Sequence, residues 1–244
     1  MIARTQRDFN GVLLLNKPTG ITAHDLVYKV RKALKIKKVG HAGTLDPMAT
    51  GLMIILVGKA TKLSQYLMGM DKSYVGTICL GKTTDSQDAE GKIVQEREVP
   101  NINTETIQKT MDTFLGDQYQ IPPMFSAIKK GGQPLYKKAR KGETIEREPR
   151  LIRVAHFYCQ SWLSPYIQFE VTSSKGTYVR TLANDLGEKL GCGAHLSELC
   201  RTMIDQFSLK KAHSIEELQV ASESQVKEWL IDVHTLTQEP FVTF

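Results

Sequence analysis

The residues best suited to chemistry stand in one short stretch, VGHAGTLDPMATGLM, from Val39 to Met53. It presents a single carboxylate, Asp46, shortly after His41. Glycine lets a backbone adopt positive φ or approach a ligand closely, so a carboxylate surrounded by glycines indicates a shaped site. The glycines of this stretch are Gly40, Gly43 and Gly51.

A plainer interpretation of the same loop stays open. An Asp that precedes a Pro is a common helix N-cap, with Asp46 as the cap and Pro47 as the first helical residue. The rest of the chain has to decide between a catalytic acid and a cap.

Other chemistries are disfavoured. No G-x-G-x-x-G follows an expected strand, and neither H-E-x-x-H nor G-x-S-x-G occurs. The acids of TTDSQDAEGK miss the alternate spacing of a calcium loop. The four cysteines form no C-x-x-C pair, so we expect free thiols. The sequence therefore predicts neither a cofactor nor a bound metal.

Composition bounds the class of protein. The 244 residues, 41% of them hydrophobic, suffice for a globular core in one large domain or two small ones. The net charge of +6 favours an anionic partner, with nucleic acid ahead of an acidic membrane surface. The opening MIARTQRDFNG lacks an apolar signal-peptide core, and no apolar run is long enough to span a bilayer. We expect a soluble cytoplasmic protein.

Strands and helices mix along the chain without a repeating βα rhythm. Thr22 and Asp25 predict a capping box at the start of a helix, and a strand in KSYVGTICLG is expected to form a hairpin with a second strand from Ile93. Arg180 lies off the apolar stripe of its helix, where it can face a cleft. Strands are expected at 11–20, 72–81, 151–160 and 165–174, and helices at 22–35, 103–115 and within 175–191.

Two basic segments favour RNA. The first is the polar face of the helix at 22–35, although an ordinary solvated face fits equally. The second is Tyr119 to Arg150, which interleaves Tyr119, Phe125 and Tyr136 with cations. Aromatic and cationic side chains together stack on bases and neutralise phosphates. We interpret this second segment as an insertion, with a flexible solvated loop as the alternative.

Five motifs then occur in an order that resembles one family. GHAGTLDPMATGLM is similar to the catalytic signature of TruB-type tRNA pseudouridine synthases, which make pseudouridine-55 in the T-loop of tRNA. The resemblance covers about Gly11 to Leu209. The supporting motifs are LNKPTGIT, KSYVGTICLGKTTDSQDAEG, YQIPPMFSAIKKGGQPLYKKAR and KGTYVRTLANDLGEKLGCGAHLSEL.

The resemblance implies an α+β fold, with a mixed, mostly antiparallel sheet, flanking helices and a central active-site cleft. It implies Asp46 as the essential catalytic aspartate, Tyr74 against the target base, and Arg180 paired with Asp46. An arginine at ion-pair distance favours the charged form of a carboxylate. Whether Asp46 attacks as a nucleophile or removes a ribose proton as a base stays open.

The same resemblance implies residues that bind the substrate. The target uridine must leave its stack, which costs a few kcal/mol, and His41 would stabilise the vacated position. Tyr178 and Leu199 would line the uracil pocket, and Lys17 would support the Asp46 loop. For Leu199 a plain core role, and for His41 an ordinary loop role, are the alternatives.

The resemblance has two departures. Asp205 and Gln206 replace a Gly and Pro pair common in the family, which puts the local turn in doubt. We expect a catalytic domain at 1–213, with an insertion at about 119–150, and a helical tail at 214–244 too short for the RNA-binding PUA domain of bacterial members. With so short a tail, we expect the protein to recognise its substrate through the T-arm of tRNA. We also expect a monomer without an obligate protein partner. An RNA-binding protein without chemistry, or a guide-dependent relative, is the alternative.

Overall fold

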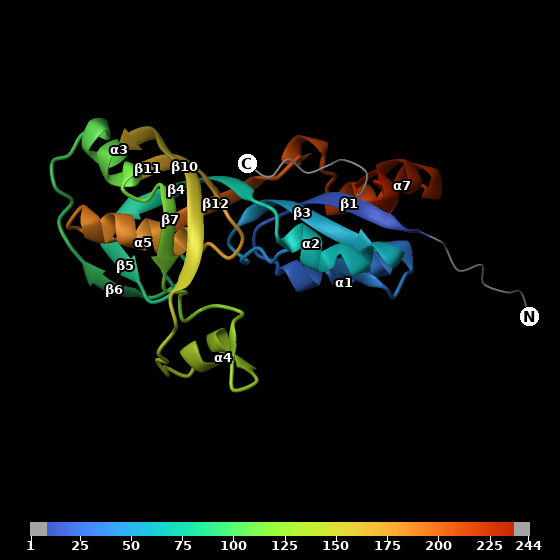
Figure 1. The fold of residues 1–244 in the computed structure, drawn as a ribbon, viewed down its shortest axis with the longest axis horizontal. Coiled ribbons are helices and arrows are strands. Elements are labelled where there is room, and N and C mark those ends of the chain that lie inside the picture. Colours follow the sequence, from blue (N-terminus) through green and yellow to red (C-terminus); the bar gives the residue numbers. More distant parts are fainter. Residues whose placement is uncertain (1–8, 237–244) are drawn as a thin grey trace, which may run out of the picture. The chain divides into compact units, whose positions relative to one another are not determined.

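The computed structural model describes residues 9–236 (Figure 1). The chain forms two compact units: unit 1 comprises Met1–Met70 with Cys200–Phe244, and unit 2 comprises Asp71–Leu199. Each unit is described by itself. Within residues 9–236, no helix is both long enough and apolar enough to cross a membrane.

Unit 1 is built around β3, a strand buried at every position after Thr50. β1 pairs antiparallel along its whole length on one side. On the other side, β2 pairs antiparallel with its final residues, and Cys200 and Arg201 of β12 pair parallel with Thr50 and Gly51. β13 pairs with the end of β12. The bounds are β1 Gly11–Lys17, β2 Val39–His41, β3 Thr50–Val57, β12 Ala194–Ile204 and β13 Phe207–Ser208.

β3 is wholly apolar after Thr50 because its side chains are buried on both faces of the sheet. α1 begins with the predicted capping box, in which Thr22 and Asp25 bond each other reciprocally. One face of β3 joins an apolar cluster that includes Leu52, Ile54 and Leu56. The helices of unit 1 are α1 Ala23–Leu34, η1 Gly58–Leu63, α2 Ser64–Met68, η2 Leu209–Lys211, α6 Ile215–Val220, α7 Glu223–Trp229 and η3 Val233–Leu236.

In unit 2 the strand order is β12, β4, β11, β10 and β7, with residues 194–199 of β12 contributing. The pairings of β4, β11, β10 and β7 are antiparallel, as expected for an α+β fold. α3 packs on β10 and on α5, and Phe114, Phe157 and Phe169 meet edge to face beneath it. The bounds are β4 Lys72–Leu80, α3 Thr104–Asp112, β7 Gly116–Gln120, β10 Arg150–Leu163, β11 Tyr166–Ser173 and α5 Val179–Lys189.

The predicted hairpin formed with a different first strand. Ile93 does begin a strand, β6, but its partner is the short β5 and not β4. Gly81, at φ 85°, separates β4 from β5. Gly76 to Thr83 match the letters G-x-x-x-x-G-K-[ST] of a phosphate-binding loop, yet they form β4 and β5 and not a loop that opens a helix. The bounds are β5 Lys82–Thr84 and β6 Ile93–Glu96.

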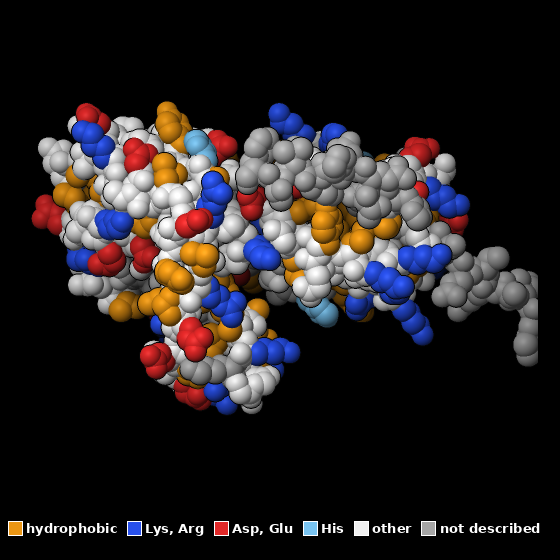
Figure 2. All heavy atoms as spheres, in the orientation of Figure 1, with side chains coloured by type: hydrophobic (Ala, Val, Ile, Leu, Met, Phe, Trp, Pro, Cys, Tyr) orange, Lys and Arg blue, Asp and Glu red, His pale blue; other side chains and the backbone are white. Residues whose placement is uncertain are grey.

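The basic insertion, expected at about 119–150, lies between β7 and β10, so that Tyr119 belongs to β7 and Arg150 to β10. Lys and Arg outnumber Glu eight to three from Lys129 to Arg150, and Figure 2 shows side chains of both signs around α4. Tyr136 packs under Arg140, whose guanidinium carbon lies 5.6 Å from the ring centroid. Its elements are β8 Lys129–Lys130, β9 Gln133–Pro134 and α4 Leu135–Ala139.

The turn at Asp205 and Gln206 is compatible with its sequence. Met203 pairs with Ser208 and Ile204 with Phe207, so the two residues close a tight β12–β13 hairpin. Asp205 adopts φ 49°, a left-handed conformation that Asp tolerates better than most residues. The departure from Gly and Pro therefore leaves the hairpin intact.

Candidate active site

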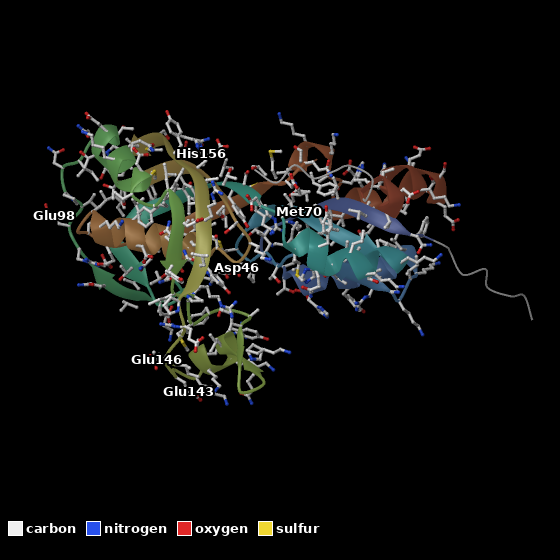
Figure 3. All side chains as sticks on the ribbon, viewed as in Figure 1. Asp46, Met70, Glu98, Glu143, Glu146 and His156 are labelled. Carbon is white, nitrogen blue, oxygen red and sulfur yellow. The ribbon has the colours of Figure 1, made fainter. Side chains whose placement is uncertain are left out.

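Asp46 lies in the loop that joins β2 to β3 as an antiparallel hairpin (Figure 3). No helix begins at Pro47; the chain bends there and enters β3 at Thr50. The helix N-cap interpretation is therefore wrong. Ala49 donates its N–H to the carbonyl of Asp46 at 3.1 Å, so the loop has internal order beside the half-buried carboxylate.

Lys17 contacts this loop through its ammonium group. It is fully buried, and its Nζ donates to the carbonyls of Pro18 at 2.8 Å, Ile21 at 2.9 Å and Pro47 at 3.2 Å. The ammonium thus joins the end of β1 to the residue that follows Asp46.

A second buried cation, Arg201, holds the residues before Asp46. Its Nη1 donates to the carbonyl of Thr44 at 3.3 Å and its Nη2 to that of Gly43 at 3.4 Å. Its backbone lies against Gly51, where a Cβ would collide with the Arg201 carbonyl. Gly51, at φ 106°, therefore has a structural reason to be glycine.

His41 ends β2 and is half-buried. Its Nδ1 is buried and has no hydrogen-bond partner among the described residues. Burial, followed by the positive charges of Arg201 and His24, lowers the pKa of His41 below its usual value. The imidazole is therefore held neutral at neutral pH.

In unit 2, Arg180 is held by a carboxylate that the sequence did not single out. Nη1 of Arg180 donates to Oδ2 of Asp88 at 3.2 Å, and the two side chains are only 6% and 4% exposed. Oδ1 of Asp88 accepts from the hydroxyl of Ser86 and from the N–H of Glu90, the latter at 3.1 Å. A fixed carboxylate therefore orients the guanidinium.

The turn that carries Asp88 is docked onto β12 and α5. The N–H of Ala89 donates to the carbonyl of Leu196 at 3.0 Å, and the N–H of Leu196 donates to that of Gln87 at 3.0 Å. The hydroxyl of Thr181 donates to Oε1 of Gln87 at 2.8 Å. The acidic turn after β5 is thus a support for Arg180.

Tyr178, the N-cap residue of α5, is fixed through its backbone by Gln120. Oε1 of Gln120 accepts from its N–H at 2.8 Å, and Nε2 of Gln120 donates to its carbonyl at 3.1 Å. The guanidinium carbon of Arg180 lies 5.8 Å from the Tyr178 ring centroid. Gln120 therefore sets the start of the helix that presents both residues.

Tyr74 and Leu199 are also buried in unit 2. Tyr74 lies on β4 opposite Val171, and its side chain is 8% exposed. Leu199 is 9% exposed and is the last residue of β12 in this unit.

The predicted residues thus fall into two sets. Unit 1 contains Lys17, His41 and Asp46, and unit 2 contains Tyr74, Tyr178, Arg180 and Leu199. The pairing of Arg180 with Asp46 joins different units and stays a prediction. Among residues 9–236, no group of three or more His, Cys, Asp or Glu is arranged to hold a metal ion.

Sequence reasoning missed Asp88, Gln120 and Arg201. Asp88 was considered only as an acid in a polar turn, and no local pattern links it to a helix so much later in the chain. Gln120 stands just before the insertion, without a signal. Arg201 had one available signal: a lone cation within the apolar-alternating AHLSELCRTMI of β12.

Two family models cover most of the chain. The model described as TruB family pseudouridylate synthase (N terminal domain) matches residues 31–179, and that described as tRNA pseudouridylate synthase B C-terminal domain matches residues 180–236. The chain belongs to the TruB family.

TruB relatives agree over nearly the full chain. The tRNA pseudouridine synthase B of Opitutus terrae is 52% identical over 229 residues, which cover 94% of this chain and 95% of that protein. The tRNA pseudouridine synthase B of Haemophilus influenzae is 47% identical over 218 residues, 89% of this chain and 70% of that protein.

Two solved structures contain chains that are similar in fold to this one. The chain is similar to one in the crystal structure of a Cbf5-Nop10-Gar1 complex, with a TM-score of 0.69 and 28% identity over 90% of this chain. A chain of an H/ACA RNP bound to a substrate RNA containing 2'-deoxyuridine gives a TM-score of 0.67 at 26% identity. This protein spans 57% of the length of each of those chains.

Proposed function

We propose that this TruB-family protein isomerises uridine to pseudouridine in tRNA, and that its target is the T-loop uridine at position 55, with Asp46 as the essential carboxylate. The observation that supports it is the Asp46 loop: one carboxylate on a hairpin whose carbonyls on both sides of Asp46 are held by buried cations. The named relatives are tRNA pseudouridine synthases B.

The reaction breaks the N-glycosidic bond of uridine, rotates the uracil and forms a bond from the ribose to C5. A proton leaves C5 and N1 takes up a proton, so that the product is an isomer of the substrate. Asp46 has two possible roles, as a nucleophile or as a base that removes a ribose proton. Each requires the ionised carboxylate. Arg180, oriented by Asp88, would pair with that carboxylate when the site is assembled, and Tyr74 would offer an aromatic face to the detached uracil.

Substrate binding requires that the target base leave its stack, at a cost of a few kcal/mol. His41 is suited to fill the vacated position because a neutral imidazole stacks on bases without the desolvation cost of a charge. Tyr178 and Leu199 would line the uracil pocket. The basic insertion would contact RNA, and its aromatic side chains support that role.

We further propose that the protein acts on the T-arm as a cytoplasmic monomer, with residues 1–213 as its catalytic domain and no obligate protein partner. The net charge of +6 and the cations of the insertion support the contact with the T-arm. Phosphate contacts make such binding strongly dependent on salt. Light scattering of the protein with and without tRNA measures the molar mass and so tests the monomeric state.

Tritium release tests the reaction, because forming the C5 bond expels the hydrogen at that carbon. An unmodified tRNA transcript labelled at uridine C5 is incubated with wild type and with Asp46→Asn. Stoichiometric release by wild type, none by a folded Asp46→Asn that still binds, and loss of release from a transcript lacking the T-loop uridine are expected. If the wild-type protein binds tRNA tightly but releases no tritium, the protein is an RNA-binding protein and the proposed enzymatic activity is overturned.

A further inference from the structure

We propose that Arg201 is a positioning residue for the reaction: its buried guanidinium fixes the peptide groups that lead into Asp46. The inference rests on the proposed function. Arg201 is 1% exposed, and all four of its recorded acceptors are neutral. They are the carbonyls of Leu52 at 2.8 Å, Thr44 at 3.3 Å and Gly43 at 3.4 Å, and Sδ of Met53 at 3.0 Å.

A buried guanidinium facing neutral acceptors is costly, because burial penalises an ionised group and neutral oxygens compensate for only part of that penalty. A core position in β12 would be filled more favourably by an apolar side chain of similar volume. The position of Arg201 therefore indicates a function other than simple packing.

The geometry shows what Arg201 connects. Nε bonds Leu52, inside β3, while the two terminal nitrogens bond Thr44 and Gly43, in the loop before Asp46. One planar fork thus ties the loop to the rigid strand that follows it. An ammonium has no such fork, so lysine cannot reproduce these bonds in one fixed arrangement.

The backbone of Arg201 contributes as well. Arg201 pairs with Gly51, and the missing Cβ of Gly51 leaves room for the Arg201 main chain. Strand pairing and side-chain bonds therefore place β12 against both ends of the segment 43–51. With Lys17 bonded to the carbonyl of Pro47, the loop is fixed on each side of Asp46.

The charge of Arg201 acts in the same loop. It contributes to lowering the pKa of His41, which precedes the loop. A fixed cation that disfavours a second positive charge favours an anion nearby. Arg201 therefore holds the loop in shape and adds a fixed positive charge beside it.

The test compares wild type, Arg201→Lys, Arg201→Gln and Val226→Ala. Val226 is buried on α7 of the same unit, away from the loop, so its variant is a control for lost stability. Pseudouridine formation is measured in single turnovers at saturating enzyme, together with tRNA affinity, thermal melting and hydrogen exchange of the segment 40–50.

We expect both Arg201 variants to react about 100-fold more slowly than wild type while binding tRNA within about threefold, since a misplaced catalytic group loses rate without losing substrate contacts. Val226→Ala, at a similar melting temperature, should keep the rate within about threefold. Segment 40–50 should exchange faster in Arg201→Lys, with α7 unchanged.

Rates of the Arg201 variants that match Val226→Ala would overturn the inference. Failure of both Arg201 variants to fold would also count against it, because a residue that only supports the fold gives that result. An inactive wild type would refute the proposed function and leave the exchange of segment 40–50 to decide the positioning of the loop.

Discussion

Arg180 and Asp88 form a buried ion pair in unit 2, with Nη1 and Oδ2 3.2 Å apart. Asp88 is itself fixed by Ser86 and by the N–H of Glu90. The guanidinium is consequently oriented before any substrate binds. Preorganisation of this kind removes reorganisation from the reacting step.

Replacing Asp88 by Asn should slow pseudouridine formation by about 100-fold, because the arginine loses its fixed partner. The unfolding free energy should fall by about 3–5 kcal/mol, the usual cost of removing one partner of a buried ion pair. Single-turnover rates and urea denaturation measure the two effects. Asp85→Asn, in the same turn but exposed, is the matched control. An equal loss of rate and stability in Asp85→Asn would refute the role of Asp88 in orienting Arg180.

Replacing Gln120 by Ala should loosen the start of α5. The variant loses both bonds to the backbone of Tyr178, which should cost about 1–3 kcal/mol of stability and weaken activity through Tyr178 and Arg180. Hydrogen exchange of residues 176–182 checks the local effect. Gln160→Ala, which removes an exposed amide on β10, should leave that segment unaffected; equal exchange in the two variants would show that Gln120 does not set the helix start.

Replacing Gly51 by Ala should destabilise the protein more than the same change at Gly116. Both glycines have positive φ, 106° and 89°, but a Cβ at Gly51 meets the Arg201 backbone while one at Gly116 meets nothing within 4 Å. Backbone strain alone costs about 1–3 kcal/mol, so Gly116→Ala measures that part. Thermal or urea unfolding measures the loss of stability. A smaller loss for Gly51→Ala than for Gly116→Ala would contradict the close approach of the Arg201 backbone to Gly51.

His41 should make stability depend on pH. Its pKa is lowered in the folded state from an ordinary 6.5, so the unfolded state binds more protons as the pH falls below that value. The contribution of the neutral imidazole is therefore present above about pH 6.5 and is lost on acidification. Between about pH 7.5 and pH 5.5, urea unfolding should show a smaller loss of unfolding free energy for His41→Asn than for wild type.

The control for that measurement is His156→Asn. His156 is exposed on β10 and stacks on Tyr158. A His41→Asn protein that keeps the whole acid dependence of wild type would show that another group is responsible.

Sequence analysis predicted the features that are written locally. The capping box at Thr22 and Asp25 lies within one turn of helix. The loop around Asp46 could be predicted because its glycines stand close together in the sequence and favour an irregular backbone. The partner of β4 lies about ninety residues later, in β11, and the nearer candidate from Ile93 was chosen wrongly. Local spacing carries no information about such pairing.

The same limit applies to the candidate site. Arg180 was singled out because it lies off the apolar stripe of its helix, but nothing in the sequence pointed to Asp88, the buried carboxylate that it contacts. Burial of a cation depends on a partner from another element, and amphipathic patterns identify only apolar faces. Arg201 was overlooked for the same reason.

Unit 1 is made from the two ends of the chain, and unit 2 occupies the sequence between them. Synthesis proceeds from the N-terminus, so a ribosome releases β3 and the Asp46 loop long before residues 200–204. A nascent chain that stops short of Arg201 carries the apolar β3 without its parallel neighbour and the Asp46 loop without the buried cation that binds its carbonyls. Truncated translation products are therefore expected to be inactive and to be substrates for chaperones.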